Sequence, residues 1–136
     1  MSTIDFAAID VHSHYGVYSR LHFSKLENDF MTGDGAVVAA RAAAVNVEKT
    51  IVSPLLGLIP RGDADSFKGN EEAAEVVANS DSLLQYVIVN PLQPETYEQA
   101  RQMLQLPKAV GIKLHPEEHL YSIVEHGAKL FEFAAE

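Results

Sequence analysis

The stretch Ile9-Asp10-Val11-His12-Ser13-His14 has the alternating pattern of a β-strand. Side chains two residues apart in a strand point to the same face, at a spacing of roughly 6.5–7 Å along the chain. His12 and His14 are therefore expected on one face with Asp10, and two imidazoles so placed can converge on one metal ion. The pair also stands where a strand ends, and active sites of α/β proteins form at the carboxyl ends of strands. The spacing predicts a metal site, with two ordinary surface histidines as the alternative.

Strands and helices alternate along the rest of the chain. Apolar runs that stop at Pro or Asn predict further strands over Lys49–Ser53, Gln85–Val89 and Ala109–His115. A loop is expected after the first strand, through Asp29. Thr32–Gly35 is expected to open a helix that closes at a left-handed Asn46. A second helix is expected after an N-cap at Asn70, a third from Pro94, and a fourth from near His126. This order indicates an α/β fold of four successive β/α units with parallel strands.

Composition excludes several classes of protein. The chain has 136 residues, with 10 Lys and Arg against 19 Asp and Glu, so its net charge is −9. An acidic chain lacks the basic surface that nucleic acids or anionic membranes require. Because it has no cysteine, disulfide scaffolds and cysteine-ligated metal sites are excluded. Met1–Asp5 lacks the basic start of a signal peptide and no apolar run is long enough to span a bilayer, so a cytoplasmic protein is expected.

A second functional pattern is Gly111-Ile112-Lys113-Leu114-His115-Pro116. With a period of two, Ile112 and Leu114 face covering helices, and Lys113 and His115 share the opposite face. A lysine in such a strand is costly to bury without a partner. Lys113 therefore either pairs with a carboxylate such as Asp10 or contributes to a metal or substrate site. His115, at the strand end, is the candidate for chemistry in contact with solvent.

These patterns resemble a known family. The first-strand Asp10–His14, the second-strand Ile51–Pro54 and the fourth-strand Gly111–Pro116 are similar to the amidohydrolase-related group of the metal-dependent hydrolase superfamily, whose members are (β/α)₈ barrels. The resemblance implies that residues 1–136 are the N-terminal part of a single barrel domain. It also implies that His12 and His14 are metal ligands, and that Lys113 corresponds to a fourth-strand position often occupied by a carboxylated lysine or a glutamate.

The resemblance implies a metal-dependent hydrolase. A divalent metal, with zinc expected first, would lower the pKa of a bound water, and the resulting hydroxide would attack a carbonyl of a small substrate. His115 and Lys113 are the catalytic candidates. Arg20 and Arg61 follow the first two strands and either bind a substrate carboxylate or are solvated loop residues. The first alternative is a decarboxylase of the same family. The second is a non-catalytic half-barrel fragment or subunit, whose open strand edges would favour a homo-oligomer.

The remaining histidines carry weaker signals. His22, His119 and His126 are expected to be polar surface residues. His115–His119 also fits the H-x-x-E-H pattern of inverted zinc proteases. That chemistry needs both histidines on one helical face, whereas His115 ends a strand and Pro116 follows it. The sequence therefore argues against the protease motif.

Overall fold

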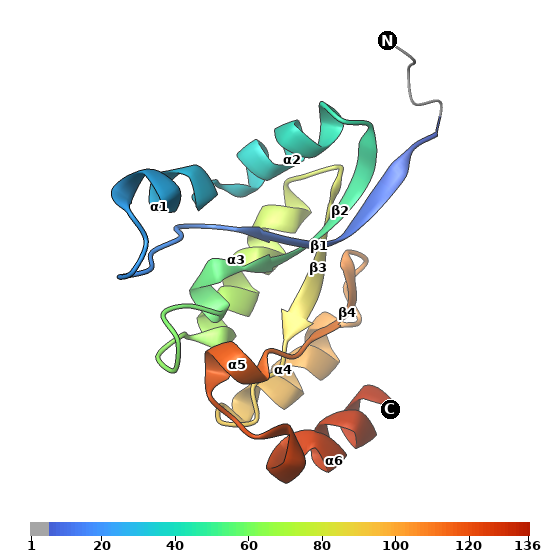
Figure 1. Cartoon of the computed structure of the whole chain (residues 1–136). Helices are drawn as coiled ribbons and strands as arrows, with labels where there is room; N and C mark the ends of the chain where they lie inside the picture. The colour runs from blue at the N-terminus through green and yellow to red at the C-terminus, as the bar shows by residue number, and fades with distance from the viewer. Residues whose placement is uncertain (1–5) are drawn as a thin grey trace.

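A single parallel sheet, backed by helices, organises the protein. The computed structural model describes residues 6–136, so Met1–Asp5 and the prediction made on them lie outside the described range. Its strands are β1 (Ala8–Tyr15), β2 (Val47–Pro54), β3 (Leu83–Ile88) and β4 (Ala109–Lys113), paired in parallel in the order β1-β2-β3-β4 (Figure 1). This confirms the predicted α/β class of four successive β/α units.

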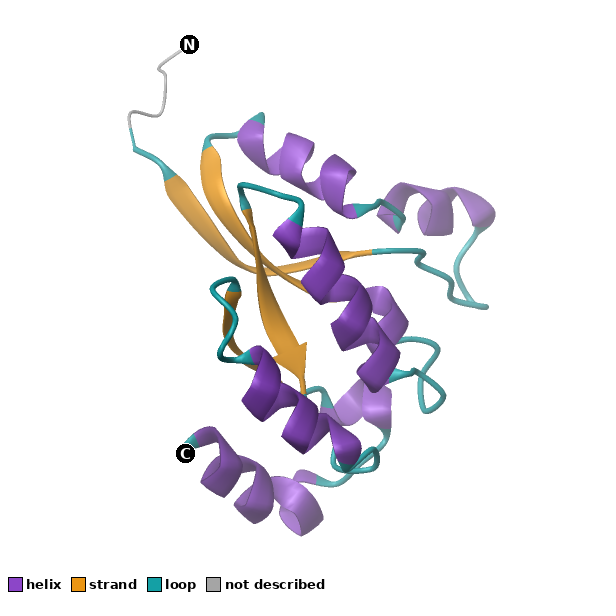
Figure 2. Ribbon diagram, turned by 180° about the vertical axis from the view of Figure 1, so that it is seen from behind, coloured by secondary structure: helices purple, strands orange, loops and turns teal. Residues whose placement is uncertain are grey.

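The helices lie between the strands and after them. They are α1 (Lys25–Met31), α2 (Gly35–Ala43), α3 (Ser66–Ala78), α4 (Glu95–Met103), α5 (Pro116–His119) and α6 (Ile123–Ala134), with a 3-10 turn η1 at Leu55–Gly57. Seen from behind, α2, α3 and α4 lie in front of the strands and cover one face of the sheet (Figure 2). Among residues 6–136, no helix is long and apolar enough to cross a membrane.

The core lies between this sheet face and the helices. Val52 of β2 packs with Val77 of α3, and Val87 of β3 packs with Leu130 of α6. Ile112 and Leu114 pack against the same core as Leu130. The predicted parity of the fourth strand is therefore confirmed for its two helix-facing residues.

Two helices were not expected from the sequence. Helix α1 occupies the segment predicted as a loop, and a capping box of Ser24 and Glu27 begins it. Helix α5 begins at Pro116, which was expected to end a strand over Ala109–His115, while the strand itself ends at Lys113. Proline is favoured at the first helical position, because its missing N–H would have no partner there. The predicted left-handed residue Asn46 is confirmed by its φ of 61°.

Asn70 lies inside α3, so its predicted role as an N-cap is wrong. The cap is Asp65, whose side chain accepts a hydrogen bond from the Lys68 amide. The Asn70 side chain is instead fully buried. Its Nδ2 donates to the carbonyl of Ile88 and to Oε1 of Gln99, both at 2.8 Å, and its Oδ1 accepts from the Ile88 amide at 2.7 Å. Asn70 thus joins α3 to the end of β3.

Helix α3 also packs very closely against η1. A Cβ atom built on Gly69 would lie 2.7 Å from both Cα and N of Gly57. Those are backbone atoms, which cannot rotate away. Glycine at position 69 therefore allows α3 to approach the turn that follows β2.

Candidate active site

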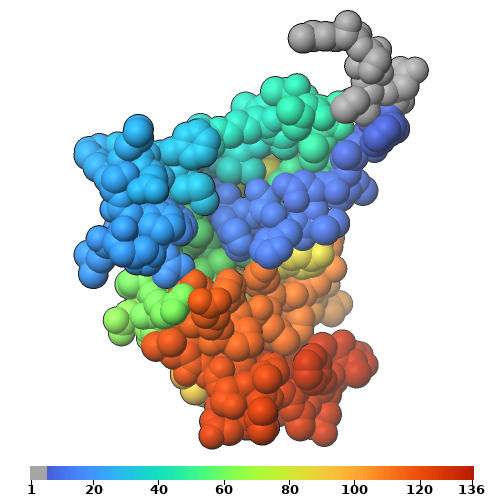
Figure 3. Space-filling model, in the orientation of Figure 1, coloured from blue at the N-terminus to red at the C-terminus, as the bar shows by residue number. Residues whose placement is uncertain are grey.

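The first and fourth strands meet at His12 and Lys113. Lys113 Nζ lies 2.9 Å from His12 Nε2, although 101 residues separate them in the chain. The two strands are the edges of the sheet and do not pair with each other. The contact therefore requires a curved sheet whose inner faces turn toward each other, as in a barrel. On the surface in Figure 3, the blue first strand lies beside orange residues of the fourth unit.

His14 lies next to His12 and is oriented by the neighbouring strand. The two rings are 5.2 Å apart and nearly perpendicular. His14 Nδ1 lies 3.2 Å from the carbonyl oxygen of Ser53, which can only accept, so Nδ1 carries the proton and the Nε2 lone pair is free. Burial, together with the nearby charge of Lys113, lowers the pKa of His14 to about 4 against the opposing hydrogen bond with Ser53. A neutral imidazole fixed in this way has the form of a metal ligand.

Asp10 does not follow the strict alternation predicted for the first strand. The register between β1 and β2 shifts, because Asp10 pairs with Thr50 and Ser13 pairs with Val52. Residues paired across parallel strands point to the same face, so Asp10 lies on the face of the core residue Val52. Its Oδ1 accepts a hydrogen bond from the His12 amide at 2.9 Å. Asp10 thus fixes the backbone at His12 rather than standing beside the imidazole rings.

Lys113 has no carboxylate partner within residues 6–136, so the predicted pairing with Asp10 is not formed. Burial lowers the pKa of Lys113. Its ammonium group faces His12 instead. The structure therefore brings His12, His14 and Lys113 together on one side of the sheet, with a cation that lacks a counter-ion among the described residues.

His115 follows β4 and is the N-cap of α5. Its Nδ1 accepts a hydrogen bond from the Glu118 amide at 3.4 Å. Burial lowers the pKa of His115, and the nearby charge of Lys113 lowers it further. The imidazole thus stands near Lys113, but β4 ends at Lys113, so His115 lies two residues beyond the strand that was predicted to end at His115.

His119 is buried, so its predicted place on the surface is wrong. It is 3% exposed, and its Nε2 lies 2.9 Å from the Gly57 carbonyl and 3.3 Å from Ser66 Oγ. These contacts fix the turn after β2 against α5.

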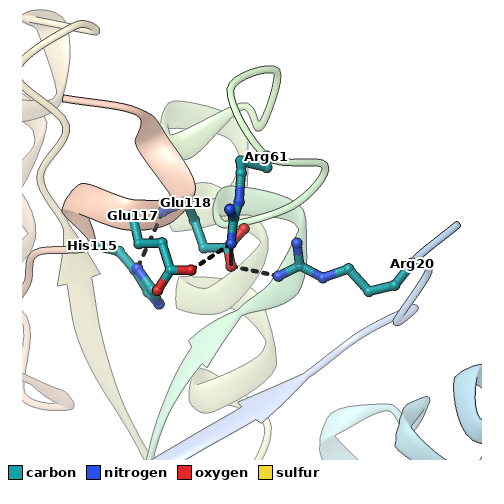
Figure 4. A network of polar contacts seen from close by, with 5 residues as sticks. All are labelled: Arg20, Arg61, His115, Glu117 and Glu118. Atoms are coloured by element: carbon teal, nitrogen blue, oxygen red, sulfur yellow. Dashed lines mark hydrogen bonds and ion pairs between the residues drawn. The ribbon is translucent and has the colours of Figure 1, made fainter. Parts of the chain in front are cut away.

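Arg20 and Arg61 converge on a carboxylate of the chain itself (Figure 4). Glu118 Oε1 lies 2.5 Å from Arg20 and 3.5 Å from Arg61, and Arg61 also contacts Glu117 at 2.6 Å. Burial alone would raise the pKa of Glu118, but hydrogen bonds from the two arginines outweigh it and leave this pKa below its ordinary value. Binding of substrate by Arg20 and Arg61 stays a prediction.

Two solved structures share this fold. A crystal structure of 2,6-dihydroxybenzoate decarboxylase complexed with 2,6-dihydroxybenzoate superposes with a TM-score of 0.56 and 16% identity. The same enzyme from Rhizobium superposes with a TM-score of 0.53 and 14% identity. The chain has the fold of part of a TIM barrel. In both comparisons 78% of this chain is covered, and it spans 37% of the length of the enzyme chain. No family model and no curated protein matches the sequence.

The donors available for a metal are two imidazoles. Within residues 6–136, no group of three or more His, Cys, Asp or Glu side chains is arranged to hold a metal ion. Zinc sites use three or four protein ligands. His12 and His14 therefore fit one part of a metal site.

Glu118 was missed in the sequence. The signal available was Pro116-Glu117-Glu118, since proline followed by acidic residues is typical of the first turn of a helix. That signal predicts the helix but not the arginines that meet Glu118 from distant loops.

Proposed function

We propose that this chain is the metal-binding first part of an amidohydrolase-related barrel enzyme that decarboxylates a small carboxylated substrate. The observation that carries the proposal is the meeting of His12 and His14 with Lys113 across the inner side of the sheet. The fold shared with 2,6-dihydroxybenzoate decarboxylase supports decarboxylation in preference to hydrolysis.

His12 and His14 would hold a divalent metal, with zinc as the first candidate. Such a metal polarises a substrate oxygen when it is bound. Because the described chain supplies two donors, we propose residues 1–136 as the N-terminal part of one barrel domain. The other donors would come from further strands or from a second copy of the chain.

Lys113 would bind the substrate carboxylate. A partly buried ammonium group without a carboxylate partner is stabilised when an anion arrives beside it.

His115 would supply the proton of the reaction. In decarboxylation the bond between the substrate carbon and its carboxyl group breaks, carbon dioxide leaves, and the substrate carbon takes up a proton. The His115 imidazole stands beside Lys113, the residue proposed to hold the departing carboxyl group. It would pass that proton from solvent to the substrate carbon.

Hydrolysis by a metal-activated water is the second candidate. The contact of 2.9 Å between Lys113 Nζ and His12 Nε2 favours it, because a carboxylated Lys113 would bring its oxygens close to the histidine pair. A mass increase equal to one carbon dioxide on Lys113 would support this candidate over decarboxylation.

Metal content tests the proposal. We expect the protein to bind zinc when the remaining donors are present, and the double variant His12→Ala/His14→Ala to lose that binding. His22→Ala is the matched control, because His22 is exposed in the loop before α1. Equal zinc content in the wild type and the double variant would refute the site. Lys113→Met should then weaken binding of 2,6-dihydroxybenzoate, used as a probe carboxylate, without loss of zinc.

A further inference from the structure

The first strand holds one residue more than its neighbour in the segment that leads to the histidine pair. From Asp10 to Ser13 the chain advances three residues along β1, while their partners Thr50 and Val52 lie two apart on β2. An extra residue of this kind is a β-bulge, and bulges next to active sites change the direction of a side chain. This one, here called the β1 bulge, falls at residues 11–12.

The β1 bulge decides on which face of the sheet His12 and His14 lie. An uninterrupted register after Asp10 would pair His12 with Val52, a core residue on the face that the helices cover. With the extra residue, His12 and His14 lie on the opposite face, where His12 reaches Lys113. A shift of one residue moves every following side chain to the other face of a strand. The bulge therefore brings both imidazoles to the candidate site.

The carboxylate of Asp10 bonds to the backbone inside the β1 bulge. Its Oδ1 accepts a hydrogen bond from the His12 amide at 2.9 Å. This contact depends on the residue type at position 10, because aspartate and asparagine side chains can bond to their own backbone two residues on, whereas an apolar side chain cannot. Such local bonds offer the backbone an alternative to the regular ladder of a sheet. Asp10 thus stabilises the irregular backbone that turns the histidines.

We propose that Asp10 is a positioning residue, whose carboxylate stabilises the β1 bulge and thereby directs His12 and His14 to the face of Lys113. It acts through the backbone, since its own side chain lies on the opposite face of the sheet from the two rings. The consequence for metal binding rests on the proposed function, in which the two histidines hold a divalent metal. The bulge itself depends on neither a metal nor a substrate.

NMR of the 136-residue protein without metal tests the proposal on two variants. Asp10→Ala removes the acceptor, whereas Asp10→Asn keeps an oxygen acceptor in the same side chain. In Asp10→Ala the His12 amide should exchange with solvent about tenfold faster, the factor that corresponds to one hydrogen bond to a charged group. The nuclear Overhauser effect between the rings of His12 and His14, whose centroids lie 5.2 Å apart, should also weaken. Asp10→Asn should retain the ring contact and most of the protection.

Asp34→Ala is the matched control. Asp34 is an exposed aspartate at the start of α2, and its side chain likewise accepts a hydrogen bond from a backbone amide, that of Val37 at 2.8 Å. Its loss should lower the unfolding temperature and leave the contact between the His12 and His14 rings unchanged. An equal weakening of the ring contact in Asp34→Ala and Asp10→Ala would overturn the proposal, because a general loss of stability would then explain it.

Two other results would also overturn it. One is an unchanged His12 exchange rate and ring contact in folded Asp10→Ala. The other is an equal loss in Asp10→Asn, since the acceptor would then not be what holds the bulge. If Asp10→Ala does not fold, Asp10→Leu removes the acceptor with little change in side-chain volume and gives the same reading. A wild-type protein that binds no zinc with the remaining donors present, but shows the expected exchange and ring contact, would refute the proposed function and leave this inference standing.

Discussion

The buried amide of Asn70 joins α3 to β3, and Asn70→Ala should lower the free energy of unfolding by about 4 kcal/mol. The magnitude follows from three hydrogen bonds of 2.7–2.8 Å to the Ile88 amide, the Ile88 carbonyl and Gln99. A buried polar group that loses its partner costs about 1–3 kcal/mol. Three such groups would be left in a site that has no exposure to solvent.

Urea unfolding followed by circular dichroism measures this loss. Asn79→Ala is the matched control, because Asn79 is an exposed asparagine at the other end of α3 with one side-chain bond to the Glu75 carbonyl. The control should change stability by less than about 1 kcal/mol. A loss of that small size in Asn70→Ala would refute the argument, since it would mean that water or rearrangement satisfies the Ile88 and Gln99 groups.

Three further predictions concern packing, pH and metal affinity. Gly69→Ala should cost about 1–3 kcal/mol in urea unfolding, because its Cβ would meet Gly57 backbone atoms at 2.7 Å; an unchanged midpoint would contradict the close packing. Glu118 has a folded pKa below its ordinary 4.5, so its charged form stabilises the fold above about pH 4.5 and this contribution disappears as the pH falls through the lower folded value. Glu118→Gln should therefore make the free energy of unfolding less dependent on pH in that acidic range. The same pH dependence in the variant as in the wild type would contradict this. Lys113→Met should tighten zinc binding about tenfold in calorimetry, because the metal need not displace the ammonium group from His12; weaker binding would favour Lys113 as a ligand.

Much of the fold was predictable because it depends on short-range patterns. Alternation within the strands and the end signals of the helices are local, and they identified all four strands and the left-handed turn at Asn46. Helix α1 was missed although Ser24 and Glu27 have the spacing of a capping box. The start of α3 was misplaced because Asn70 is as typical of a cap as Asp65, and only burial distinguishes them.

The candidate site was predictable only in part, because its contacts join residues distant in sequence. Strand parity correctly put Lys113 on the face opposite Ile112, and it is this placement that lets Lys113 reach His12. Nothing local shows that Glu118 receives two arginines, or that His119 fills a space beside Gly57. Those environments depend on which loops meet in space, and the residue types alone do not determine this.

The spatial order of the strands has a consequence for how the chain folds. Each strand pairs with the one that precedes it in the sequence, so the sheet can grow by one neighbour at a time, even during synthesis. The contact between His12 and Lys113 differs, since it closes a span of 101 residues and needs β4 to be in place. It should therefore be the last part of the structure to form, and a ligand bound there would select completely folded molecules and stabilise them by mass action.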